Sequence, residues 1–65
     1  MEFGHNFKHY RTVCNLTQRQ VAKLLGIAQT NISNWENNHT RPEYEHLVKL
    51  STIYGVSIDK LLGIQ

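Results

Sequence analysis

The stretch that decides the fold is TQRQVAKLLGIAQTNISNWEN, residues 17–37. It begins with a capping box, in which the Thr17 hydroxyl accepts from the Gln20 backbone and the Gln20 side chain returns to the Thr17 amide. The helix that follows is expected over residues 18–25, with Val21, Leu24 and Leu25 as its apolar residues, and to stop at Gly26. A second helix is expected over residues 29–37, so the segment predicts two short helices joined by a tight turn.

The second of these helices has an unusual composition. Ile32 and Trp35 are spaced i, i+3 and are expected to face inward. Five other positions carry uncharged side chains that form hydrogen bonds: Gln29, Thr30, Asn31, Ser33 and Asn34. Ordinary exposed helix surfaces favour Lys, Glu and Arg, since Asn, Ser and Thr have poorer helix propensity. The pattern indicates a face that forms hydrogen bonds with a partner.

Three further helices are expected on either side of this segment. The first covers residues 3–14, with an apolar stripe of Phe3, Phe7, Tyr10 and Cys14, and is ended by Asn15 in a left-handed conformation. Pro42 is expected to set the start of the next helix, with Glu43 and Glu45 in its first turn, where the helix dipole favours anions. The apolar residues of this helix and of a last one capped by Ser57 are Leu47, Leu50, Tyr54, Ile58, Leu61 and Leu62.

Length and composition set the broad class. The chain has 65 residues and a formal net charge of +2, so we expect one all-α domain over residues 1–65 that is mildly basic. Its single cysteine, Cys14, cannot form an internal disulfide, which fits a reducing compartment. No apolar run approaches the roughly 18 residues of a membrane span, and no signal-peptide pattern is visible. A cytoplasmic protein without membrane contact is therefore expected.

Residues 3–63 resemble the lambda-repressor/Cro-like (Xre-type) helix-turn-helix family. The matching positions are Gly4, Arg11, Leu16, Thr17, Gln18, Val21, Ala22, Leu25, Gly26, Ile27, Ile32, Glu36, Asn37, Pro42, Leu47, Val56 and Leu61. The resemblance implies a compact five-helix fold with the helix-turn-helix at about residues 17–37. It also implies a bacterial or phage-encoded transcriptional regulator, expected to be a repressor, that binds a double-stranded DNA operator.

The resemblance assigns roles to individual residues. Helix 29–37 would enter the major groove, with Gln29 as the leading base reader because its amide can pair with adenine N6 and N7. The other expected base readers are Thr30, Ser33 and Asn34. The residues expected to contact phosphates or the DNA backbone are Gln18, Arg19, Asn31, Asn37, His39, Thr40 and Arg41. Arg11 and Glu36 are expected to form a partly buried ion pair between the first helix and the end of the third.

Three positions depart from the family pattern. Ala28 replaces the usual Ser or Thr at the cap of the reading helix, a loss of about 1 kcal/mol. Asn38 stands where the family prefers Gly, which Asn can replace in a left-handed conformation. Trp35 is larger than the usual aliphatic residue, so its local packing is expected to be adjusted. Ala22, by contrast, matches the family pattern, and its small side chain is expected where two helices cross at close range.

Two questions about assembly and function stay open at this point. The last helix, with Ile58, Leu61, Leu62 and Ile64, either contributes to a homodimer contact or simply closes the core. A protein-interaction module or an antitoxin-type autoregulator of the same fold is the alternative to an operator-binding regulator. An interaction surface would favour aromatic residues, Met or Leu on the 29–37 face, which carries amides and hydroxyls instead.

An enzyme is the third possible class of protein. His5 and His9 are spaced i, i+4 and could chelate a metal, but no further ligand lies near them in sequence. Cys14 lies on the apolar stripe of the first helix and is interpreted as a small hydrophobic residue rather than a nucleophile. We expect no catalytic residue, no metal, no cofactor and no small-molecule substrate.

Overall fold

The computed structural model describes residues 3–64, and these form five helices and no strand. The helices are α1 (Gly4–Val13), α2 (Gln18–Leu25), α3 (Gln29–Glu36), α4 (Tyr44–Tyr54) and α5 (Ile58–Leu62). The predicted all-α, five-helix fold is confirmed. The outermost positions of the expected domain, residues 1–2 and 65, lie outside the described residues.

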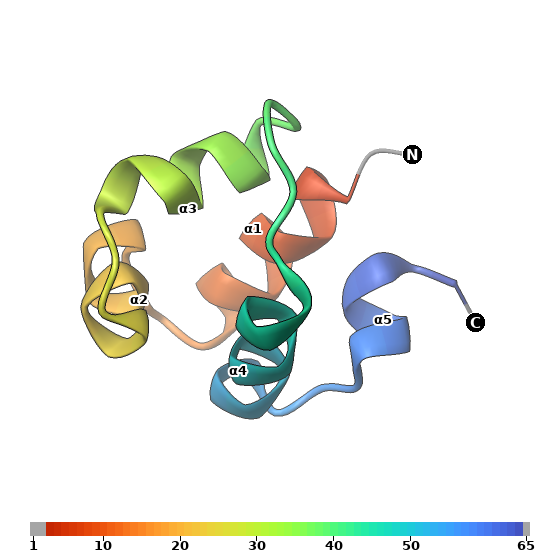
Figure 1. Cartoon of the computed structure of the whole chain (residues 1–65). Coiled ribbons are helices and arrows are strands. Elements are labelled where there is room, and N and C mark those ends of the chain that lie inside the picture. The colour runs from red at the N-terminus through yellow and green to blue at the C-terminus, as the bar shows by residue number, and fades with distance from the viewer. Residues whose placement is uncertain (1–2, 65) are drawn as a thin grey trace.

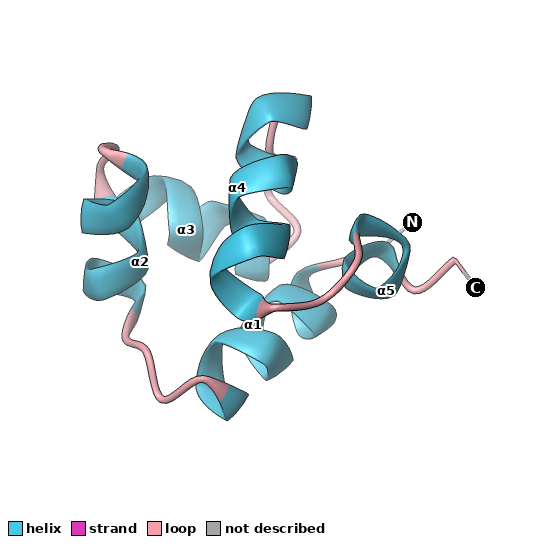
Figure 2. Ribbon diagram, turned by 90° about the horizontal axis from the view of Figure 1, so that it is seen from below, coloured by secondary structure: helices cyan, strands magenta, loops and turns pink. Residues whose placement is uncertain are grey.

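The helices are arranged so that α3 lies at one side of the molecule. It forms the upper edge in the view of Figure 1, with α1 and α2 below it and α4 and α5 further down. α3 packs against both α2 and α1, while α5 packs against α1 and α4. Figure 2, seen from below, shows α4 and α1 in front of α3. One side of α3 is therefore held by two helices, and its other side faces outward.

All five helices contribute to one core. Its buried apolar side chains are Phe7, Val21, Ala22, Leu25, Ile32, Trp35, Leu50, Tyr54 and Leu61. The predicted inward positions of α3, Ile32 and Trp35, are 2% and 5% exposed. Trp35 lies beside His46 of α4, with ring centroids 5.4 Å apart.

The residues expected to start or stop helices adopt the conformations and hydrogen bonds expected of them. Both bonds of the capping box are present, since the Gln20 amide donates to Thr17 Oγ1 at 3.0 Å and the Thr17 amide donates to Gln20 Oε1 at 2.8 Å. Gly26 adopts a left-handed φ of 71° after α2, and Asn15 does the same after α1 with a φ of 57°. Ser57 accepts a hydrogen bond from the Lys60 amide at the start of α5.

Two expectations were wrong in detail. Glu43 does not lie in the first turn of α4, because its backbone is extended (ψ of 163°) and it is the residue before the helix, so that only Glu45 lies in that turn. α1 and α3 are also shorter than expected, since α1 covers Gly4–Val13 and α3 ends at Glu36.

Leu24 is the third difference from the expected pattern. Its side chain is 62% exposed, whereas Val21, Ala22 and Leu25 form the buried face of α2. It lines a shallow apolar groove between α2 and α4 together with Val48 and Ile53. Of the three residues named as apolar in the sequence of α2, the fold therefore buries Val21 and Leu25 but not Leu24.

The start of α1 rests directly on the end of α3. A Cβ atom on Gly4 would overlap the backbone carbonyl of Glu36, so only glycine permits this approach. The Gly4 amide donates to Asn38 Oδ1 at 2.9 Å, and Asn38 has a left-handed φ of 63°. Asn38 therefore replaces glycine in the turn after α3 and also caps α1 with its side chain.

This double role of Asn38 leads to a prediction for two substitutions. Asn38→Gly keeps the left-handed turn and loses the cap, which lowers the free energy of unfolding by about 1 kcal/mol. Asn38→Ala loses the cap and also strains the turn, which lowers the free energy of unfolding by about 1–2 kcal/mol more. Urea unfolding followed by Trp35 fluorescence measures both. Equal losses of stability in the two variants would contradict the assigned roles.

Candidate nucleic-acid interface

The outward side of α3 is made of polar, uncharged side chains. Gln29, Thr30 and Asn31 are exposed, and Ser33 and Asn34 are half-buried. The four expected base readers, Gln29, Thr30, Ser33 and Asn34, are spaced i, i+1, i+4 and i+5, which places them on one side of the helix. The structure thus brings these four side chains together opposite the buried Ile32 and Trp35.

The residue directly before α3 is Ala28, which has an extended backbone (ψ of 145°) and no side-chain oxygen to cap the helix. Asn31, expected to contact the DNA backbone, donates its Nδ2 hydrogen to the Ala28 carbonyl at 3.3 Å. The Asn31 side-chain amide therefore bonds to the backbone just before its own helix, whereas the Gln29 side-chain amide bonds to Gln18 of α2.

A buried ion pair fixes the other end of α3. Arg11 of α1 donates from Nε to Glu36 Oε2 at 2.6 Å and from a terminal nitrogen to Glu36 Oε1 at 3.0 Å. The two side chains are 11% and 2% exposed. The remaining terminal nitrogen of Arg11 donates to the Leu16 carbonyl at 2.8 Å. The guanidinium is thus held by two elements, and it fixes the position of the carboxylate on α3.

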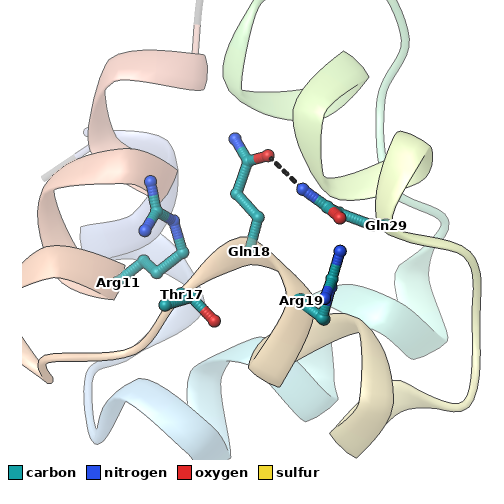
Figure 3. A pocket seen from close by; sticks show the side chains of 5 residues that line it. All are labelled: Arg11, Thr17, Gln18, Arg19 and Gln29. Atoms are coloured by element: carbon teal, nitrogen blue, oxygen red, sulfur yellow. Dashed lines mark hydrogen bonds between the residues drawn. The ribbon is translucent and has the colours of Figure 1, made fainter.

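The hydrogen bonds continue from this pair to the surface. Gln18 Nε2 donates to Glu36 Oε1 at 3.0 Å, and Gln29 Nε2 donates to Gln18 Oε1 at 3.3 Å. Figure 3 shows the Gln18 side chain standing between Arg11 and Gln29, with its oxygen toward Gln29. The expected leading base reader is therefore linked through one amide to a buried charge. This link was not predicted from the sequence, although each of the four residues was expected to have a role.

The environment of the ion pair affects two ionisable groups. The hydrogen bond that Arg11 donates to Glu36 raises the pKa of Arg11, so the guanidinium stays charged. Burial raises the pKa of Tyr54 above its ordinary value, and the negative charge of Glu36 acts in the same direction. Tyr54 therefore stays neutral beside the pair, and Arg11 is the cation that balances Glu36.

An open pocket lies at the N-terminus of α2. Figure 3 shows the side chains that line it: Arg11, Thr17, Gln18, Arg19 and Gln29. The first amides of a helix lack intrahelical partners and carry partial positive charge, so this end of α2 favours an anion. Arg19, which is exposed, adds a full positive charge at the same place. Two of the expected phosphate-contacting residues, Gln18 and Arg19, thus lie together at a site suited to phosphate.

The remaining expected phosphate contacts lie at the other end of α3. Asn37, His39, Thr40 and Arg41 are all exposed. The loop that carries them is held against α3, because the His39 amide donates to the Asn34 carbonyl at 2.8 Å and Asn37 Nδ2 donates to Ser33 Oγ at 3.3 Å. The two groups of candidate phosphate contacts therefore flank the polar side of α3.

Between residues 3 and 64, no group of three His, Cys, Asp or Glu side chains is arranged to hold a metal ion, and His5 and His9 are exposed on α1. No helix in the described part of the chain has the length and apolar character needed to cross a membrane.

Two short helices joined at a left-handed glycine, with the second anchored on the core and presenting a polar side, define a helix-turn-helix domain. A family profile described as "Helix-turn-helix" matches residues 7–61, and the chain belongs to this family, of the lambda-repressor-like (Xre) type.

Three relatives illustrate the match. The chain is 40% identical over 63 residues to the HTH-type transcriptional regulator ImmR of Bacillus subtilis and 42% identical over 63 residues to the HTH-type transcriptional activator BcrR of Enterococcus faecalis. It is 33% identical over 63 residues to the cryptic phage CTXphi transcriptional repressor RstR of Vibrio cholerae. Each match covers 97% of this chain, but 50% of ImmR, 31% of BcrR and 56% of RstR.

The buried pair yields a stability prediction. Arg11→Ala leaves the Glu36 carboxylate buried without a counter-ion, which costs about 3–5 kcal/mol of unfolding free energy. Lys8→Ala, which removes an exposed cation from the same helix, is the control and is expected to change stability by less than about 0.5 kcal/mol. Thermal unfolding by circular dichroism measures both. Similar small effects for the two variants would show that the pair does not hold α3.

Proposed function

We propose that the chain binds double-stranded DNA in a sequence-specific way, with α3 in the major groove, and that it represses transcription. The observation that carries this proposal is the polar, uncharged outer side of α3, which is held on the core by Ile32, Trp35 and the Arg11–Glu36 pair. A major groove admits an α-helix and presents donors and acceptors that such side chains can read. RstR, which is named as a repressor, supports repression and is matched over 56% of its length, whereas BcrR, which is named as an activator, is matched over 31% of its length.

The proposed base readers are Gln29, Thr30, Ser33 and Asn34. Gln29 lies in the first turn of α3, and the N-terminal residues of a recognition helix are those that reach base edges. Its amide and that of Asn34 suit adenine, while Thr30 and Ser33 can contact a thymine methyl or a base acceptor. α3 carries no Lys or Arg, the side chains that commonly read guanine, so the operator is expected to be read mainly through adenine and thymine.

Phosphate contacts on both sides of α3 would set the register of the domain on the duplex. One group comprises Gln18, Arg19 and the first amides of α2. The other comprises Asn37, His39, Thr40 and Arg41, and Asn31 is proposed to contact the DNA backbone between the two groups. Because these groups contain few cations, we expect modest affinity for one half-site and a shallow dependence on salt.

Modest affinity for one half-site favours a homodimer on a two-fold symmetric operator, with half-sites about 34 Å apart. The whole chain, residues 1–65, would act as one helix-turn-helix unit of that dimer. Leu61 of α5 is 0% exposed and contributes to the core, while Ile64 is 50% exposed. The apolar surface that α5 and the residues after it offer to a partner is therefore smaller than the sequence alone implies, and Ile64, which follows α5, is its most exposed part.

The experiment that tests this function begins with selection of bound duplexes from a random pool. Affinity for the enriched sequence is then measured by fluorescence anisotropy at two salt concentrations. We expect a symmetric sequence, and a loss of about 1–3 kcal/mol of binding free energy for each amide removed in Gln29→Ala and Asn34→Ala. Thr52→Ala, an exposed change on α4, is the control with unchanged affinity.

One result would contradict sequence-specific DNA binding by α3. If no sequence is enriched and the Gln29 and Asn34 variants bind every duplex as the unchanged protein does, only non-specific phosphate attraction remains. The function would then be that of a protein-interaction module or of an antitoxin-type autoregulator that uses another surface.

A further inference from the structure

The Glu36 carboxylate has more hydrogen-bond partners than the ion pair alone requires. It accepts two bonds from Arg11 and a third from Gln18 Nε2, at 3.0 Å, although the Glu36 side chain is only 2% exposed. Gln18 is half-buried at the start of α2, and its amide oxygen is the acceptor for Gln29. A charge inside the fold is thus connected, through a single side chain, to an exposed side chain on the outer side of α3.

We propose that the negative charge of Glu36 sets the orientation of the Gln29 amide through Gln18, and that Glu36 and Gln18 are thereby positioning residues for base specificity. This inference rests on the proposed function, because it assigns a specificity role within the same α3 surface.

The orientation of both amides follows from their donors and acceptors. An ionised carboxylate can only accept hydrogen bonds, so Gln18 must turn its Nε2 toward Glu36. The Gln18 oxygen then points the other way, toward Gln29, and can only accept. Gln29 must therefore turn its own Nε2 toward Gln18. The charge of Glu36 in this way determines which end of each of the two amides faces its neighbour.

The fixed Gln29 amide retains one N–H and its oxygen for a base edge. This pair matches adenine, whose N7 accepts and whose N6 amino group donates. Guanine presents two acceptors, N7 and O6, so the oxygen of the fixed amide would face an acceptor. Held in this orientation, Gln29 discriminates against guanine, and an amide free to rotate by 180° could instead turn its donors toward guanine.

The source of the orientation is the charge rather than the surface bond alone. The Gln29–Gln18 bond is 3.3 Å long and exposed to water, so by itself it holds the amide weakly. The Gln18–Glu36 bond is charge-assisted and part-buried, which makes it the stronger of the two. Arg11 keeps the charge in place, because it binds both carboxylate oxygens and also the Leu16 carbonyl.

The test uses the selected duplex and a second duplex in which the adenine read by Gln29 is replaced by guanine. That position is identified first, as the base pair at which Gln29→Ala loses its preference. The ratio of the two affinities is then measured for the unchanged protein, for Glu36→Gln and for Gln18→Met. Each variant is expected to lower the adenine-over-guanine ratio about fivefold or more, the lower limit of what one bidentate contact supplies.

A double variant shows whether Glu36 acts through Gln18. In Gln18→Met, the additional change Glu36→Gln is expected to leave the ratio unchanged, since the connection is already broken. Arg41→Ala is the matched control, because loss of a phosphate contact weakens binding to both duplexes equally and leaves the ratio unaltered. Melting curves establish that each variant is folded at the temperature of the measurement, and if Glu36→Gln is unfolded, the ratio for Gln18→Met decides.

Three outcomes separate the possibilities. A lowered ratio in both single variants, with no further effect in the double variant, supports the inference. Equal weakening on both duplexes in Glu36→Gln and Gln18→Met, while Gln29→Ala still loses its base preference, overturns the inference and leaves the proposed function intact. Binding that is insensitive to Gln29→Ala overturns both.

Discussion

The buried ion pair between Arg11 and Glu36 is the constraint on which the rest of the structure depends. It joins the first helix to the last residue of α3, 25 positions further along the chain, in a place where both side chains are almost fully covered. Such a pair adds little net stability, because desolvation offsets much of the Coulomb attraction. It does specify geometry, since a carboxylate with a fixed bidentate partner allows one placement of the helix that carries it.

The contacts around the ion pair also fix the position of α3. Gly4 lets α1 approach the end of α3, and Asn38 both turns the chain after α3 and caps α1. Ile32 and Trp35 hold the inner side of α3 in the core. Because these contacts fix α3, its polar residues face outward, between the two groups of candidate phosphate contacts. The position of the pair thus explains the placement of the surface that we assign to DNA.

Much of this could be predicted from the sequence because the signals are local. The capping box at Thr17, the left-handed residues Asn15 and Gly26, and the 3.6-residue periodicity each act within one helical turn, and the helices begin and end close to where these signals place them. The misplaced features depend on contacts between distant residues. The exposure of Leu24 depends on how much of α2 its neighbours cover, and the Gln18–Glu36 and Gln29–Gln18 bonds join residues 18 and 11 positions apart. Composition alone could show that α3 is rich in amides, but not which amide atom faces which partner.

The central claim is that the outer side of α3 and its two flanking groups form the DNA-binding surface. The most direct measurement is a titration of the ¹⁵N-labelled protein with the selected duplex, followed through backbone amide chemical shifts. If this claim holds, the largest changes fall on α3, the first turn of α2 and residues 37–41, while the groove lined by Leu24, Val48 and Ile53 changes little. Largest changes in that groove, with α3 unaffected, would contradict it.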